Sequence, residues 1–228
     1  MPVTLCDGAP SDVLPAQNID IARRVKWFVV ENLRTARRFL KRCDREIDID
    51  SLTFAELNEH TPAAEISKLL DPMRQGHDMA VMSEAGCPAI ADPGADLVAV
   101  AQREGFDVVP LVGPSSILLG LMGSGFNGQS FCFNGYLPIE EPRRGAKLRE
   151  MMNRINRERQ TQIFIETPYR NTKLIAELAS RLPGDTLLAV GCNLTSPTQS
   201  IVTRPLRQWA ATDTTPYNKV PCIFLLFN

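Results

Sequence analysis

The hydrophobic pattern of the first half of the chain alternates short apolar runs with longer amphipathic segments. The apolar runs predict strands at residues 25–30, 52–54, 79–82 and 108–112. The amphipathic segments predict helices at residues 33–43, 62–74 and 95–103. Strands that alternate with helices are typical of a parallel sheet covered on both faces. We therefore expect an α/β domain with a mostly parallel sheet.

The second half has a less regular rhythm, which favours a second α/β domain with a mixed sheet. Strands are predicted at residues 130–134, 162–166, 187–191 and 222–227. Helices are predicted at residues 117–122, 143–157, 170–181 and 206–211. Gly113-Pro114 closes the last strand of the first half, so the predicted domains are residues 1–112 and 113–228. A cleft between two such domains is a natural place for a ligand.

Composition and charge exclude several classes of protein. Hydrophobic residues make up 44% and charged residues 22%, which is typical of a folded chain, and the net charge is only −1. The apolar runs are too short to span a membrane and the N-terminus lacks a signal-peptide pattern, so we expect a cytoplasmic protein without a membrane partner. Six scattered cysteines without a Cys-x-x-Cys pair, and only two histidines, predict no metal site.

A glycine motif at residues 123–128 matches G-x-G-x-x-G, but its context argues against a dinucleotide site. The motif follows a predicted helix and precedes a strand, whereas phosphate binding needs the reverse order. We interpret these glycines as the end of a helix and the loop after it.

The loop at residues 83–94 follows an apolar strand and is dense in Gly, Pro and small side chains. Gly86 tolerates conformations that other residues avoid, and the small side chains leave room for a ligand. Ligands in open α/β sheets collect at the carboxyl ends of the strands. An ordinary strand-to-helix turn is the alternative.

Basic residues concentrate between residues 23 and 45, where there are nine Lys or Arg residues and only two acidic residues. Several recur at helical spacing, so much of the charge lies on one side of a helix. This face is either solvated or binds phosphates. A second basic cluster at residues 143–159 favours the hypothesis that the protein binds a phosphate-bearing partner. In addition, Glu166, Tyr169 and Arg170 lie at the end of a predicted strand.

These segments resemble the tetrapyrrole methylase superfamily, the class III S-adenosylmethionine-dependent methyltransferases. The nearest branch is similar to the ribose 2′-O-methyltransferases of small-subunit ribosomal RNA. Its Ser-Asp-Ala-Gly-Thr-Pro and Asp-Pro-Gly motifs correspond here to residues 83–88 and 92–94. Its Pro-x-Pro-Gly-Pro, Phe-Tyr-Glu-Ser-x-x-Arg and Glu-Asp-Thr-Arg motifs resemble residues 110–114, 164–170 and 31–34.

The chain also departs from the pattern of that branch. The first strand is expected to be truncated, since residues 1–7 resemble only the loop after it, with Cys6 at a usual Gly. Cys192-Asn193 replaces a charged pair, and Glu84 and Asn32 replace aspartates. The resemblance is therefore to a divergent subgroup.

The resemblance implies S-adenosylmethionine as cofactor, RNA as partner and a homodimer. Carried over to this chain, the cofactor pocket contains Pro2, Ala85, Gly86, Cys87, Ile90, Ser115, Ser116, Glu166 and Leu194. Substrate contacts are expected from Arg34, Arg38, Lys41 and Arg42. The catalytic base is unknown, with Glu31, Glu84 and Glu166 as candidates.

Two other functions stay open at this point. In the first, the chain methylates a small tetrapyrrole and the basic helix is only a solvated face. In the second, it is a catalytically degenerate RNA-binding protein, which the departures at Cys6 and Cys192-Asn193 suggest.

Overall fold

A parallel sheet of three strands forms the centre of the first half of the chain. In the computed structural model, which describes residues 1–228, β1 (Trp27–Val30) lies between β2 (Thr53–Glu56) and β3 (Met79–Met82). Trp27 pairs with Thr53 and Met79, and Val30 pairs with Glu56 and Met82. The three strands therefore end level, and the residues that follow them share one edge of the sheet.

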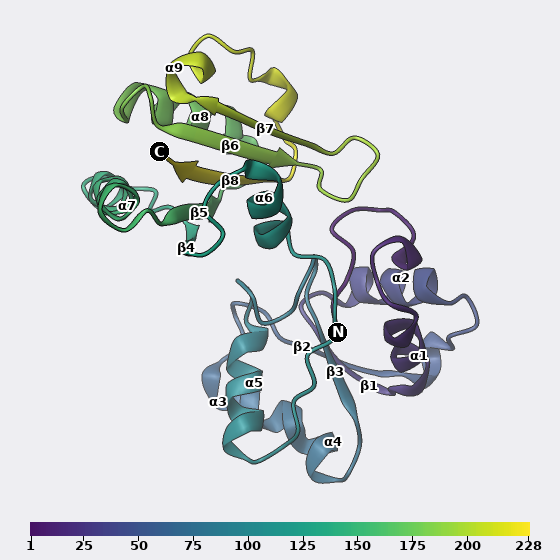
Figure 1. Cartoon of the computed structure of the whole chain (residues 1–228). Coiled ribbons are helices and arrows are strands. Elements are labelled where there is room, and N and C mark those ends of the chain that lie inside the picture. The colour runs from purple at the N-terminus through teal and green to yellow at the C-terminus, as the bar shows by residue number, and fades with distance from the viewer. The chain divides into compact units, whose positions relative to one another are not determined.

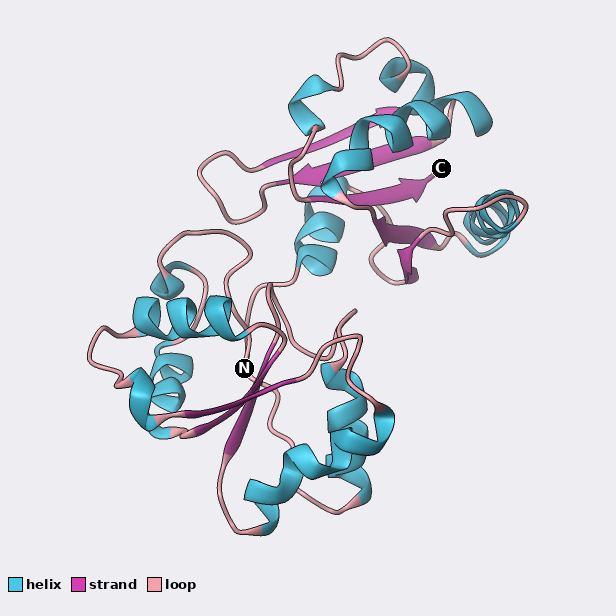
Figure 2. Ribbon diagram, turned by 180° about the vertical axis from the view of Figure 1, so that it is seen from behind, coloured by secondary structure: helices cyan, strands magenta, loops and turns pink.

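Helices cover both faces of this sheet, as the parallel pattern predicts (Figures 1 and 2). One face carries α1 (Ala16–Arg24) and α2 (Leu33–Cys43), and its core includes Phe28 and Val30. The other carries α3 (Ala63–Ile66), α4 (Asp71–Arg74) and α5 (Gly94–Arg103), and its core includes Val29. Successive strand residues thus point to opposite faces, and both faces are buried.

Two predictions for this half are wrong in detail. Residues 108–112 form no strand: Val109 and Val112 are 74% and 73% exposed, no strand of the sheet lies beside them, and Pro110 cannot donate to a ladder. The helix expected at residues 62–74 is divided into α3, a 3-10 segment (Ser67–Leu70) and α4, because Pro72 begins a new turn instead of continuing the old one.

The second half contains a mixed sheet of five strands. Its order is β4 (Phe131–Tyr136), β5 (Thr161–Ile165), β8 (Cys222–Phe227), β6 (Leu187–Cys192) and β7 (Ser200–Pro205). β4 and β5 are parallel, and the other pairs are antiparallel. Sequence patterning did not predict β7, an edge strand whose side chains are partly or fully exposed.

Helices also cover this sheet. α7 (Arg143–Glu158), α8 (Asn171–Arg181) and α9 (Leu206–Trp209) enclose a core with Phe164 and Phe224. α6 (Ser116–Ser124) packs on β6, β7 and β8. The glycine motif is confirmed as a helix end, because α6 stops at Ser124 and Gly125 adopts φ +77°.

The two halves are separate units, Met1–Ser115 and Ser116–Asn228, each with its own sheet and core. The predicted α/β class, with a parallel first sheet and a mixed second sheet, is confirmed. None of the helices combines the length and apolar character needed to cross a membrane.

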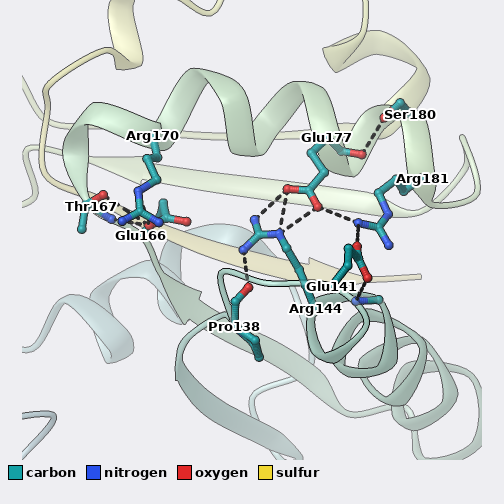
Figure 3. A network of polar contacts seen from close by, with 10 residues as sticks. Pro138, Glu141, Arg144, Glu166, Thr167, Arg170, Glu177, Ser180 and Arg181 are labelled. Atoms are coloured by element: carbon teal, nitrogen blue, oxygen red, sulfur yellow. Dashed lines mark hydrogen bonds and ion pairs between the residues drawn. The ribbon is translucent and has the colours of Figure 1, made fainter.

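An ion-pair network fastens α7 to α8 (Figure 3). The guanidinium of Arg144 binds the Glu177 carboxylate through two nitrogens, at 2.8 Å from Nε to Oε1 and 2.7 Å from Nη2 to Oε2. Its third nitrogen donates to the Pro138 carbonyl at 2.9 Å, and Arg181 joins Glu177 to Glu141. Bonding to Arg144 holds the pKa of Glu177 below its usual range.

We expect Glu177→Gln to lower the free energy of unfolding by about 2 kcal/mol at pH 7, because it leaves the largely buried Arg144 without its carboxylate. A lowered carboxyl pKa stabilises the fold above the unfolded pKa, and this stabilisation disappears as the pH falls through the folded value. The deficit of the variant should therefore shrink in acid. Urea unfolding at several pH values measures it.

Glu150→Gln is the matched control, since Glu150 pairs with Lys147 and Arg154 on the exposed side of α7. Exposed pairs contribute little, so this change should cost less than about 1 kcal/mol. Equal losses in the two variants, or a Glu177→Gln deficit that does not change with pH, would contradict the assigned role.

Candidate active site

The loop at residues 83–94, which follows β3, has an unusual backbone. Gly86 adopts φ +74°, and Ala89 and Ala91 adopt φ 64° and 61°, a region that residues with a side chain rarely occupy. Such conformations cost free energy and are found preferentially at functional sites. The loop is therefore more than a minimal turn between β3 and α5.

Two other segments of the first unit hold this loop. The Val3 amide donates to the Gly86 carbonyl at 2.9 Å, and the Cys87 sulfur lies 3.5 Å from the Pro114 carbonyl oxygen. A methyl group at Gly86 would lie 3.2 Å from that same oxygen, and one at Gly113 would overlap the Pro2 ring. The structure thus brings Pro2, Gly86 and Cys87 together, three of the residues predicted to bind a cofactor.

The far end of the loop contains an unsatisfied carboxylate oxygen. Asp92 Oδ1 accepts the Gly94 amide at 2.7 Å, whereas Oδ2 is buried and accepts no hydrogen bond. Ile90, another predicted pocket residue, is 52% exposed despite its apolar side chain. A buried acceptor without a partner and an exposed isoleucine are what a segment built to meet another molecule would contain.

Two of the three candidate bases lie next to each other at the level ends of the strands. Glu31 follows β1, and its Oε2 accepts the Glu84 amide at 3.1 Å. The Thr35 hydroxyl donates to Glu84 Oε1 at 3.1 Å. Burial, together with the charges of Glu84 and Asp92, raises the pKa of Glu31, although the hydrogen bond from Glu84 opposes this shift.

A pocket of about 520 Å³ lies at the start of α2. The Asn32 side chain caps this helix by accepting the amides of Arg34 and Thr35. The residues that line the pocket are Asn32, Leu33, Arg34, Arg37, Arg38 and Glu56. Arg34 and Arg38 were predicted to bind substrate. Arg37 was not, although the same helical spacing could have identified it.

The other two predicted substrate contacts have partners within the protein. The Arg42 guanidinium bonds to the Thr4 hydroxyl at 3.3 Å and to the Gly8 carbonyl. The Lys41 ammonium donates to the Arg45 carbonyl at 2.8 Å. Arg42 therefore fastens the N-terminal segment to α2, and neither residue lines the pocket.

Part of the second basic cluster also has partners within the protein. Arg144 is bound to Glu177, while Lys147 and Arg154 share Glu150. Arg159 lies over the Phe227 ring at 4.8 Å. These contacts weaken the expectation that this cluster meets phosphates.

In the second unit, Glu166 follows β5 and is nearly buried. Its Oε1 accepts the Thr167 amide at 2.8 Å and lies 4.0 Å from Arg170 Nε (Figure 3). Leu194 is also buried and lies between Asn193 and Thr195, which adopt φ 48° and 71°. Ser116 begins α6 in this unit, whereas Ala85 and Ser115 belong to the first. The predicted cofactor residues are thus distributed over both units.

Comparison with known proteins gives a consistent picture. The sequence profile of the tetrapyrrole (corrin/porphyrin) methylases matches residues 11–210. A relative from Vibrio cholerae, called ribosomal RNA small subunit methyltransferase I, is 32% identical over 198 residues, which are 86% of this chain and 66% of the relative. A relative of the same name from Mycobacterium tuberculosis H37Rv is 31% identical over 207 residues, 90% of this chain and 70% of the relative. The chain thus spans about two thirds of the length of these relatives.

Solved structures share the fold at lower identity. The methyltransferase CobJ matches with a TM-score of 0.62 and 18% identity over 94% of this chain and 88% of its own. Uroporphyrin-III C-methyl transferase from Thermus thermophilus, complexed with S-adenyl homocysteine, matches with a TM-score of 0.54 and 16% identity over 97% and 93%. Since the family profile covers most of the sequence, the chain belongs to the tetrapyrrole (corrin/porphyrin) methylases, a family of methyltransferases.

Proposed function

We propose that this protein transfers a methyl group from S-adenosylmethionine to small-subunit ribosomal RNA, at a ribose 2′-hydroxyl. The observation that carries the proposal is the similarity to ribosomal RNA methyltransferases over 86–90% of the chain. The ribose position rests on the motifs of the resembling branch at residues 83–88, 92–94 and 164–170.

The residues of the loop at 83–94 fit a cofactor of this kind. Gly86 leaves backbone bare beside Pro114, and Asp92 provides a carboxylate oxygen that has no partner within the chain. We propose that Pro2, Ala85, Gly86, Cys87, Ile90 and Ser115 bind S-adenosylmethionine from the first unit. Ser116, Glu166 and Leu194 are the proposed contacts from the second. The Thermus thermophilus relative, complexed with S-adenyl homocysteine, supports this choice of cofactor.

The cofactor supplies a methyl group already activated on a sulfonium. The protein then has to align the acceptor hydroxyl and take up its proton, because a ribose hydroxyl is a weak acid. Glu31, Glu84 and Glu166 stay the candidates for this base. Glu31 has the most suitable environment, since its raised pKa brings it nearer to the working pH and it lies at the strand ends.

The pocket at the start of α2 is the proposed RNA contact. Arg34, Arg37 and Arg38 present three guanidinium groups there, and guanidinium pairs with phosphate in a bidentate way. Arg42 is better assigned to holding residues 4–8.

We also propose a cytoplasmic location, where ribosomal RNA is found, and a homodimer, which light scattering can check.

Replacing Gly86 by Ala should weaken S-adenosylmethionine binding at least tenfold, as measured by calorimetry. The alanine backbone would have to adopt a left-handed conformation, and its methyl group would crowd the Pro114 carbonyl and Leu5. Gly105→Ala is the matched control, because Gly105 has a similar φ of +78° and open space around it. Unchanged binding in Gly86→Ala would contradict the assignment of the loop.

Replacing Arg34 and Arg38 together by Glu should lower RNA affinity at least tenfold at about 150 mM salt and reduce the salt dependence of binding by about two ion contacts. Cofactor affinity should not change. Lys68→Glu with Arg103→Glu makes the same change in charge on the α3 and α5 side of the sheet. If both double variants lose RNA affinity equally, the effect is one of net charge and the pocket is not the contact.

Incubation with S-adenosylmethionine carrying a labelled methyl group tests the function itself. We expect label in small-subunit RNA, in a nucleoside methylated at its ribose, and none in a uroporphyrinoid offered in parallel. Label in the porphyrinoid alone would establish the small-molecule alternative. Absence of cofactor binding and of transfer, together with retained RNA binding, would support the degenerate RNA-binding alternative.

A further inference from the structure

Two cysteines face each other across neighbouring strands of the second sheet. Cys192 ends β6, Cys222 begins β8, and the two are direct partners in the antiparallel register. The Asn193 amide donates to the Pro221 carbonyl at 3.1 Å, which makes Cys192 and Cys222 a pair without hydrogen bonds between them. In such pairs the Cα atoms are about 4.5 Å apart and the side chains approach most closely.

The two sulfurs are already near bonding distance. Cys192 Sγ lies 2.8 Å from Cys222 Sγ, whereas a disulfide bond is about 2.05 Å long and accepts Cα separations from about 4.4 Å. Small side-chain rotations would therefore close the bond, and the strands would not have to separate.

The environment makes the pair chemically unequal. The hydrogen bond from the Cys222 thiol lowers the pKa of Cys192, whereas the same contact and burial raise the pKa of Cys222. Cys192 is nearly buried and Cys222 is partly exposed, so a small oxidant has an approach at the Cys222 side. Two neighbouring thiols, one of which can resolve the oxidised form of the other, are the usual arrangement of reversible redox pairs.

We propose that Cys192 and Cys222 form a reversible disulfide, a modification site that is independent of the proposed methyl transfer. Two S–H bonds break and one S–S bond forms, and two electrons and two protons pass to the oxidant. Hydrogen peroxide is thereby reduced to two molecules of water, or a low-molecular-weight disulfide to two thiols. A dithiol reductant reverses the step.

The bond would tie the end of β6 to the start of β8. The segment that follows Cys192 contains Asn193 and Thr195 in left-handed conformations, with buried Leu194 between them. The bond would close a loop between two cysteines that are 30 residues apart, and this restricts the unfolded chain. The oxidised protein should therefore melt about 5–10 °C higher than the reduced protein.

Treatment of the full chain with hydrogen peroxide or glutathione disulfide tests the proposal. Mass spectrometry should show a loss of two hydrogens and a tryptic peptide containing Cys192 joined to one containing Cys222. Dithiothreitol should restore the original mass and the two separate peptides. Recovery of separate peptides, with oxidation confined to other cysteines, would overturn it. This readout uses the unmodified protein and does not depend on how any variant folds.

Variants then connect the bond with stability. Cys132→Ser is the matched control, because the Cys132 sulfur contacts Phe133 and Asn134 on β4 and lies outside the pair. It should keep the rise in melting temperature on oxidation, whereas Cys222→Ala should lose it. A rise that persists in Cys222→Ala would assign the effect to another cysteine.

Discussion

The candidate active site depends on the level register of three parallel strands. Because Val30 pairs with both Glu56 and Met82, β1, β2 and β3 all end at one edge of the sheet. Glu31 directly follows β1 at that edge, and Glu84 lies in the loop after β3. Glu56, the last residue of β2, accepts the Leu33 amide in the first turn of α2. Both faces of this sheet are buried, so a shift of one residue would exchange the side chains that pack into the two cores, such as Phe28 and Val29. Packing on both faces therefore fixes the position of the polar residues.

The loop after β3 extends this edge with small residues and an unusual backbone. Its backbone carbonyl at Gly86 accepts the Val3 amide, and Ala89 and Ala91 adopt left-handed conformations that cost free energy. The N-terminal segment that contains Val3 is bound to α2 by Arg42. One arginine of the basic helix therefore holds the N-terminal segment, while Arg34 and Arg38 line the pocket.

Sequence patterning predicted most elements, and its errors have physical causes. The strand Met79–Met82 and the helix Leu33–Cys43 were predicted with their observed bounds, because a continuous apolar run marks the first and a helical hydrophobic period marks the second. The strand Ser200–Pro205 was missed because an edge strand buries too little to show that period. Arg42 bonds to residues 4–8, and Glu56 lines a pocket together with residues of α2. Both arrangements bring together segments that are far apart in the chain, so no local sequence pattern could predict them.

We propose that this fold delivers a methyl group to a ribose of small-subunit ribosomal RNA. The most direct measurement is mass mapping of that RNA from cells that lack the gene, before and after its return. We expect one ribose methyl group to be missing without the gene and restored with it. An unchanged set of ribose methyl groups in the small-subunit RNA would contradict it.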